Sequence, residues 1–272
     1  MSHQYSPAWR KLTIVILRPL LYGLLKRDWR GQKNVPRKGG LIIAANHISE
    51  SDPLALAHFV YEAGRYPVYL AKSTLFDVRF LKTVLRGTGQ IPVYRDSSDA
   101  ALALRDAEQA LVDGECLMFY PEGSCTRDPD LWPMTGQTGV ARMALTTGAT
   151  VVPVASWGAH ELLPYKKGEH SGLRGSLKKG FHPFPRKTMQ VIAGPAVDFS
   201  KYEGEPLSKA VLREATDDLM RAIADLLGEL RGQEPPKELY DHHKAQEERR
   251  GPLDGETGGD EPAGGPESGA AS

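Results

Sequence analysis

The sequence lacks several features that would restrict its class. Two cysteines among 272 residues, Cys116 and Cys125, are too few for a disulfide framework. Lysine and arginine total 34, as do aspartate and glutamate, and the absence of net charge argues against a general nucleic-acid binder. No internal repeat is visible. The length allows one large domain with a sizeable core, which is typical of a single intracellular α/β enzyme.

The N-terminal region also lacks the run of about 20 apolar residues that a bilayer-spanning helix needs. Residues 12–17 and 20–25 are apolar, but Arg18 and Pro19 separate them. Residues 1–39 carry nine cations and one acid, a formal charge of +8, and no signal-peptidase-like site ends the segment. Two short apolar pieces flanked by cations predict an interfacial anchor on an anionic leaflet. The alternative is an N-terminal helix packed on the core.

What the sequence does have is a histidine and an aspartate placed directly after an apolar run. Residues 41–45 open from two glycines and close on a polar turn, as a buried strand does. His47 lies where this strand ends, and Asp52, followed by Pro53, begins a helix. A carboxylate on one ring nitrogen leaves the other free to take a proton from a hydroxyl, so His47 is a candidate general base. Taken alone, Asp52 is equally interpreted as an ordinary helix N-cap, and His47 as a structural or solvent-facing histidine.

A second group of polar residues follows another apolar run, residues 116–119. Pro121 and Gly123 force a turn that lets backbone amides face outward. The turn gathers a carboxylate, two hydroxyls and a guanidinium, from Glu122, Ser124, Thr126 and Arg127. Such a mixture suits a polyol phosphate, because arginine grips phosphate oxygens by a fork and glutamate accepts from hydroxyls. The alternative is a β-turn with a surface Glu–Arg pair.

Two further segments complete a series of four blocks. The matching positions are Asn46, His47 and Asp52 in the first, Ile91 and Arg95 in the second, Pro121, Glu122 and Gly123 in the third, and Val152, Pro153 and Val154 in the fourth. In this order the blocks resemble the glycerolipid acyltransferase family, typified by 1-acylglycerol-3-phosphate acyltransferase, over roughly residues 10 to 230. One position departs from the family pattern. Cys125 stands where the family usually has an arginine, and the nearest arginine is Arg127.

The resemblance implies direct acyl transfer from a thioester donor, acyl-CoA or acyl carrier protein, to the free hydroxyl of a lysophospholipid. The favoured acceptor is 1-acylglycerol 3-phosphate, which would give phosphatidic acid, and no cofactor or metal ion is implied. His47 and Asp52 would form the general-base dyad. The implied acceptor-binding residues are Lys72, Arg95, Glu122, Gly123, Ser124 and Arg127, with the cations on the phosphate. Lys72 is equally interpreted as a surface lysine. Glycerol 3-phosphate or a lyso-glycolipid remains an alternative acceptor.

The rest of the chain alternates between helical and strand patterns. Helical patterns occur at residues 74–85, 98–112, 139–147 and 208–230, with strands between them and another at 189–193. This alternation predicts an α/β fold: a mixed, largely parallel central sheet covered by helices, with an N-terminal membrane-interfacial helical segment. We expect an anchor at 1–38, a catalytic domain at 39–231 and a polar, largely disordered tail at 232–272.

Residues 161–188 form a second basic stretch with interleaved apolar residues. It suits a membrane-facing loop, a dock for an acidic carrier protein or a solvated loop. With the anchor, it favours a peripheral or monotopic protein on the cytoplasmic face of the cell membrane. Two other functions remain open: a thiol enzyme in which His47 activates Cys125, and a non-catalytic membrane-binding protein on the same fold. The first lacks the Gly-x-Ser-x-Gly elbow, and the second would be expected to lose His47 or Asp52.

Overall fold

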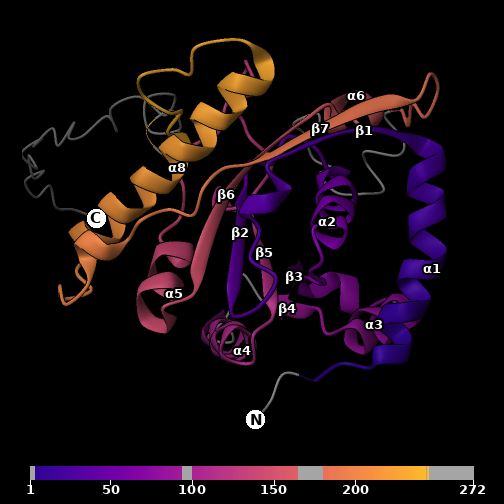
Figure 1. The fold of residues 1–272 in the computed structure, drawn as a ribbon, viewed down its shortest axis with the longest axis horizontal. Helices are drawn as coiled ribbons and strands as arrows, with labels where there is room; N and C mark the ends of the chain where they lie inside the picture. Colours follow the sequence, from indigo (N-terminus) through magenta and orange to yellow (C-terminus); the bar gives the residue numbers. More distant parts are fainter. Residues whose placement is uncertain (1–3, 94–99, 165–179, 243, 245–272) are drawn as a thin grey trace, which may run out of the picture. The chain divides into compact units, whose positions relative to one another are not determined.

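The apolar runs of the sequence become neighbouring strands of one seven-stranded sheet in the computed structural model, which describes residues 4–93, 100–164, 180–242 and 244 (Figure 1). Arg95 and most of the second basic stretch, residues 165–179, lie outside the described residues. Residues 1–240 form one compact unit, to which all the elements below belong, and residues 241–272 are grouped as a second.

The sheet is parallel except for one pair of strands. Its order is β1 (Leu25–Arg30), β7 (Lys187–Ala193), β6 (Thr150–Trp157), β2 (Leu41–Ala45), β5 (Cys116–Phe119), β3 (Pro67–Lys72) and β4 (Ile91–Val93). Strands β6 and β7 are antiparallel, and every other neighbouring pair is parallel. The prediction of a mixed, largely parallel sheet is therefore confirmed.

Helices cover both faces of this sheet. One face carries α1 (Pro7–Leu24), α2 (Asp52–Glu62) and α6 (Ala159–Leu162); the other carries α4 (Ala100–Val112), α5 (Gly139–Thr147) and α8 (Lys209–Arg231). Helix α3 (Arg79–Thr88) packs beside α1. Short 3-10 turns occur at η1 (Gln32–Asn34), η2 (Ser73–Phe76) and η3 (Ser200–Tyr202). No helix among the described residues is both long and apolar enough to cross a membrane.

The central strand β2 is apolar throughout because both of its faces are covered. Leu41, Ile43 and Ala45 pack toward α2, while Ile42 and Ala44 pack toward the side of α5 and α8. All five side chains are fully buried. A continuous apolar run, in place of an alternating one, is what a two-sided parallel strand requires. The strand therefore fixes the position of the residues that follow its carboxyl end, Asn46 and His47.

The N-terminal segment is attached to the core at both ends of α1. The Arg10 guanidinium forms two hydrogen bonds of 3.1 Å with the Glu115 carboxylate and lies between the rings of Tyr5 and Tyr66. After α1 ends, residues 25–30 form β1, which pairs with β7 along its whole length. The segment predicted as an anchor thus supplies an edge strand as well as a helix. Its charged side chains hid this strand from pattern analysis, because edge strands tolerate charge.

The C-terminal end of α8 leads into a segment that returns along the helix. Gly232, with φ of 62°, ends α8 in the left-handed conformation. The Arg221 guanidinium then donates to the carbonyls of Pro236 and Lys237, and Tyr240 forms a β-bridge with Met134. Residues 232–240, assigned from the sequence to the polar tail, therefore pack on the folded unit.

Candidate active site

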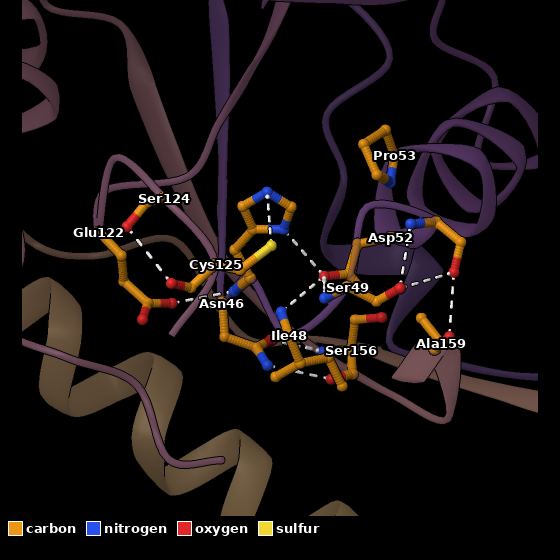
Figure 2. A network of polar contacts seen from close by, with 12 residues as sticks. Asn46, Ile48, Ser49, Asp52, Pro53, Glu122, Ser124, Cys125, Ser156 and Ala159 are labelled. Carbon is orange, nitrogen blue, oxygen red and sulfur yellow. Dashed lines mark hydrogen bonds and ion pairs between the residues drawn. The ribbon is translucent and has the colours of Figure 1, made fainter. Parts of the chain in front are cut away.

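The imidazole of His47 forms a close pair with the carboxylate of Asp52. Nδ1 of His47 lies 2.9 Å from Oδ2 of Asp52, and Asp52 is fully buried at the first residue of α2 (Figure 2). The same oxygen accepts backbone N–H groups from Ile48 at 2.6 Å and Ser49 at 2.8 Å. Asp52 is therefore not an ordinary N-cap, because its bonds run back into the loop and not forward into the helix.

This arrangement determines the direction of the hydrogen bond between the two side chains. An ionised carboxylate can only accept hydrogen bonds, so Nδ1 of His47 carries the proton and donates it to Asp52. The other nitrogen, Nε2, then carries the lone pair that can accept a proton. The dyad predicted from the sequence is thus brought together in the geometry that a general base needs.

Glu122 supports His47 through the backbone. Oε1 of Glu122 accepts the His47 N–H at 2.9 Å, and Oε2 accepts the Met134 N–H at 2.9 Å. Burial raises the pKa of this carboxyl to about 8, against the lowering effect of the two backbone hydrogen bonds. Both oxygens already have partners in the protein. Glu122 was predicted to bind the acceptor, and that role stays a prediction; in the structure its oxygens hold the backbone of His47 and Met134.

The loop that follows β5 contacts both the ring and the backbone of His47. The Tyr120 ring stacks on the His47 ring with centroids 4.0 Å apart and planes 18° from parallel. The Thr126 N–H donates to the His47 carbonyl at 2.7 Å, and the Thr126 hydroxyl donates to the Trp132 carbonyl at 2.7 Å. Gly123, with φ of 74°, supplies the left-handed turn that lets the loop come back. The ring of His47 is therefore held in one orientation.

Cys125 lies against the free nitrogen of His47. Its sulfur is 3.4 Å from Nε2, and the residue is buried (Figure 2). Burial, followed by the negative charge of Asp52, raises the pKa of the Cys125 thiol well above its usual range. The thiol therefore stays protonated and is a poor nucleophile. The thiol-enzyme alternative requires this contact between Cys125 and His47. It also requires a thiolate, and the burial of Cys125 and the charge of Asp52 both disfavour that form.

Asn46 and two serines fix the ends of the loop that contains His47. The Asn46 side chain donates to the Ser156 carbonyl at 3.0 Å and accepts its N–H at 2.8 Å, which joins the ends of β2 and β6. The hydroxyls of Ser49 and Ser51 donate to the carbonyls of Leu163 and Ala159. Sequence analysis matched Asn46 to a motif without assigning it a role. The partners of all three residues are more than 100 positions away, so no local signal could identify this role.

The predicted acceptor-binding residues lie around the same edge of the sheet, except Arg95, which is outside the described residues. Lys72 is exposed at the carboxyl end of β3, which runs parallel to β5 and, through it, to β2. Arg127 is half-buried, and no described acid lies within ion-pair distance of its guanidinium. The Ser124 hydroxyl donates to the Cys125 carbonyl at 3.3 Å, and Gly123 is exposed. Neither Lys72 nor Arg127 forms a described hydrogen bond or ion pair with His47.

Comparisons with known proteins find relatives of this chain in one enzyme family. The sequence model of the Acyltransferase family matches residues 26–157. The 1-acyl-sn-glycerol-3-phosphate acyltransferase of Borreliella burgdorferi is 34% identical over 182 residues, 66% of each chain. A chloroplastic 1-acyl-sn-glycerol-3-phosphate acyltransferase of Brassica napus is 24% identical over 180 residues, 65% of this chain and 47% of that protein. The chain thus spans about two thirds of one curated relative and about half of the other.

A solved structure has the same fold. The crystal structure of the 1-acyl-sn-glycerophosphate acyltransferase from Thermotoga maritima has a TM-score of 0.57 with this chain, with 20% sequence identity and 80% of each chain covered. The family match begins in β1 and ends in β6, so it contains His47, Asp52 and the loop from Tyr120 to Arg127. The chain therefore belongs to the acyltransferase family.

Proposed function

We propose that this protein transfers a fatty acyl group from a thioester donor to the free hydroxyl of a lysophospholipid. The favoured acceptor is 1-acylglycerol 3-phosphate, as in the names of the relatives, and the product would be phosphatidic acid. The observation that carries the proposal is the buried Asp52 carboxylate on Nδ1 of His47, which leaves Nε2 as a base at the strand edge. The fold and the family match supply the context.

The reaction needs no covalent enzyme intermediate. Nε2 of His47 takes the proton of the acceptor hydroxyl while its oxygen forms a bond to the thioester carbonyl carbon. Asp52 stabilises the imidazolium that results. When the tetrahedral intermediate collapses, the carbon–sulfur bond breaks and the departing thiolate receives the proton from His47. The products are an ester and a free thiol, so acyl-CoA or acyl carrier protein is a co-substrate and no further cofactor takes part.

The acceptor phosphate needs cations near the base. Lys72 and Arg127 are suited to this role because both lie at the carboxyl edge of the sheet and no described acid pairs with them. Arg95 would complete the set. Holding the phosphate places the free hydroxyl close to Nε2, which supplies the proximity part of catalysis. Since the acceptor is a lipid, we also propose a peripheral position on the cytoplasmic face of the cell membrane.

Cys125 must leave room for the substrate. Its sulfur lies 3.4 Å from Nε2, where the acceptor hydroxyl has to arrive, so the thiol moves aside when the acceptor binds. This requirement separates direct transfer from a thiol mechanism. We expect Cys125→Ala to retain substantial activity. A fully inactive variant with an intact fold would support an acyl-thioester intermediate on Cys125 instead.

The experiment that tests the proposal is a product assay on the full chain. Purified protein is incubated with isotope-labelled acyl-CoA, or labelled acyl carrier protein, and a panel of lysolipids, and the products are identified by mass. We expect a labelled diacyl product, most abundant with 1-acylglycerol 3-phosphate, and a loss of about 10²–10⁴-fold in His47→Ala. No transfer from either donor to any lysolipid by folded protein, or near-normal turnover in His47→Ala, would refute the proposal.

A further inference from the structure

The segment that follows β3 exposes large apolar side chains at the surface. Phe80 is 75% exposed and Val78 is 54% exposed, and Leu75 is exposed beside them. Single apolar residues on a protein surface are ordinary, but three within six positions form a concentrated apolar surface. They lie on η2 and at the start of α3.

Cations surround these apolar side chains and lack acidic partners. Residues 72–88 contain one acid, Asp77, and four cations: Lys72, Arg79, Lys82 and Arg86. All four cations are exposed, and among the described residues none lies within ion-pair distance of a carboxylate. An exposed cation beside an exposed aromatic ring is the composition of helices that lie in a membrane interface.

Four of the five N-terminal arginines, in contrast, are already paired with carboxylates within the fold. Arg10 pairs with Glu115, Arg18 and Arg27 pair with Glu62, and Arg30 pairs with Asp28 and Glu229. The formal +8 of residues 1–39 therefore overstates the charge that this segment offers to a partner. Besides the exposed Lys11, α1 presents apolar side chains, namely Leu12, Val15, Ile16, Leu17 and Leu20.

The two surfaces are next to each other. The end of α3 meets the start of α1, where the Ser6 N–H donates to the Gly87 carbonyl and Arg10 donates to the Thr88 carbonyl. The start of α3 is near the carboxyl ends of the parallel strands, since six residues separate it from the end of β3. His47 lies at the same end of these strands, because β3 runs parallel to β5, and β5 runs parallel to β2.

We propose that Leu75, Val78, Arg79, Phe80, Lys82 and Arg86, here called the α3 patch, bind an anionic lipid bilayer. The exposed face of α1 contributes apolar contacts beside it, and the α3 cations bind the lipid phosphates that the paired N-terminal arginines do not reach. The inference rests on the proposed function, because a site that uses a lipid acceptor must be held at the interface. Charge complementarity selects the anionic bilayer as the partner.

Vesicle sedimentation of the full chain tests this inference without any turnover. The charge variant is Arg79→Gln/Lys82→Gln/Arg86→Gln. The matched control is Lys33→Gln/Arg37→Gln/Lys38→Gln, which removes three exposed cations between β1 and β2, at the edge opposite to His47. On vesicles that contain one third phosphatidylglycerol, we expect the charge variant to bind on the order of 100-fold more weakly and the control to change little. Binding of the wild type should also fall with salt.

A second pair of variants tests the apolar part of the patch. Phe80→Ser should weaken vesicle binding by about 10-fold, whereas Val112→Ser, at a residue 72% exposed at the end of α4, should leave it unchanged. Thermal unfolding checks that all variants fold. Equal binding by the wild type and both α3 variants, or no binding by the wild type, would overturn the inference. If the α3 variants bound vesicles normally but bound acyl carrier protein more weakly than the wild type does, the patch would be a binding site for that protein instead. His47→Ala binds vesicles normally whether or not the proposed reaction is correct.

Discussion

Asp52 concentrates three hydrogen bonds on a single carboxylate oxygen, and this makes its charge difficult to replace. One bond comes from His47 and two come from the backbone of Ile48 and Ser49. An amide of the same shape can still accept the backbone bonds. It is neutral, however, so it cannot stabilise an imidazolium as a carboxylate does.

We therefore predict that Asp52→Asn folds normally but loses on the order of 10⁴ in kcat, as expected when the partner of a catalytic histidine is neutralised. The measurement is steady-state kinetics with acyl-CoA and 1-acylglycerol 3-phosphate, with thermal unfolding as the check on folding. KM for the acceptor should change little, because Asp52 does not face it. A kcat within a few-fold of the wild type would exclude Asp52 from the dyad.

Glu122 gives a pH dependence with a definite sign. Its pKa is raised from 4.5 to about 8 in the folded protein, chiefly by burial. Between these values the folded protein binds more protons at this site than the unfolded chain does. The free energy of unfolding should therefore fall as the pH rises through this window, with a slope of up to about 1.4 kcal/mol per pH unit.

We predict that Glu122→Gln removes this component of the slope. Denaturant unfolding at several pH values between 5 and 8 would give the free energy of unfolding for both proteins, and the difference between the two curves isolates Glu122 from all other titrating groups. The difference should shrink as the pH rises, because only the wild type loses a proton. Parallel curves for the two proteins would show that Glu122 is ionised throughout this range.

Single residues also mark the limit of what the sequence could predict. The approach of His47 to Asp52 followed from local features: a buried strand, a polar turn and a helix start within 12 residues. The use of both Glu122 oxygens by backbone amides could not be predicted, because one donor is 75 residues away. The same holds for the bonds between Asn46 and Ser156, which join the carboxyl ends of β2 and β6. Motifs identify the residues, and tertiary contacts decide which of them face the substrate.

At the scale of elements, Glu62 links three parts of the N-terminal half. It lies at the end of α2 and accepts hydrogen bonds from the Tyr22 hydroxyl of α1 and from the side chains of Arg27 and Trp29 in β1. The buried His58 imidazole also lies 3.2 Å from it. The same helix begins with Asp52, so Glu62 secures the element that carries half of the dyad.

We predict that Glu62→Ala lowers the free energy of unfolding by about 3 kcal/mol, because it leaves a charge and two other donors without their acceptor. Glu205→Ala is the control, since Glu205 is exposed and its side chain makes no described ion pair. Chemical denaturation of both variants measures the difference. Equal stabilities would mean that solvent replaces the Glu62 contacts at no cost.

The elements that the sequence predicted well are those with a clear pattern of buried apolar residues. Strands β2 and β5 appear as unbroken apolar runs, and α5 occupies the predicted residues 139–147. Strand β1 was missed because four of its six residues, Lys26, Arg27, Asp28 and Arg30, are charged. A strand at the edge of a sheet pairs on one side only and keeps its charges in water, so its sequence resembles that of a surface segment.

At the scale of the whole molecule, the N-terminal segment has two roles that a simple deletion would confuse. Its outer side exposes several apolar side chains of α1, whereas its inner side contributes the buried Leu21 and Leu25 to the core. Deleting residues 1–30 removes an edge strand and the pairs with Glu115 and Glu62 along with the apolar surface. Each buried leucine contributes about 1.5–3 kcal/mol, and a typical domain has a net stability of about 5–15 kcal/mol.

We therefore predict that a protein lacking residues 1–30 is grossly destabilised, whereas Val15→Ser/Ile16→Ser folds normally and binds anionic vesicles more weakly. Val15 and Ile16 are 61% and 56% exposed, so their replacement removes apolar surface without disturbing the core. Thermal unfolding and vesicle sedimentation, measured on both proteins, separate the two roles. Cooperative unfolding of the truncated protein near the wild-type temperature would make the segment a dispensable anchor. Unchanged vesicle binding by Val15→Ser/Ile16→Ser would instead limit α1 to its packing role and leave membrane contact to other parts of the chain.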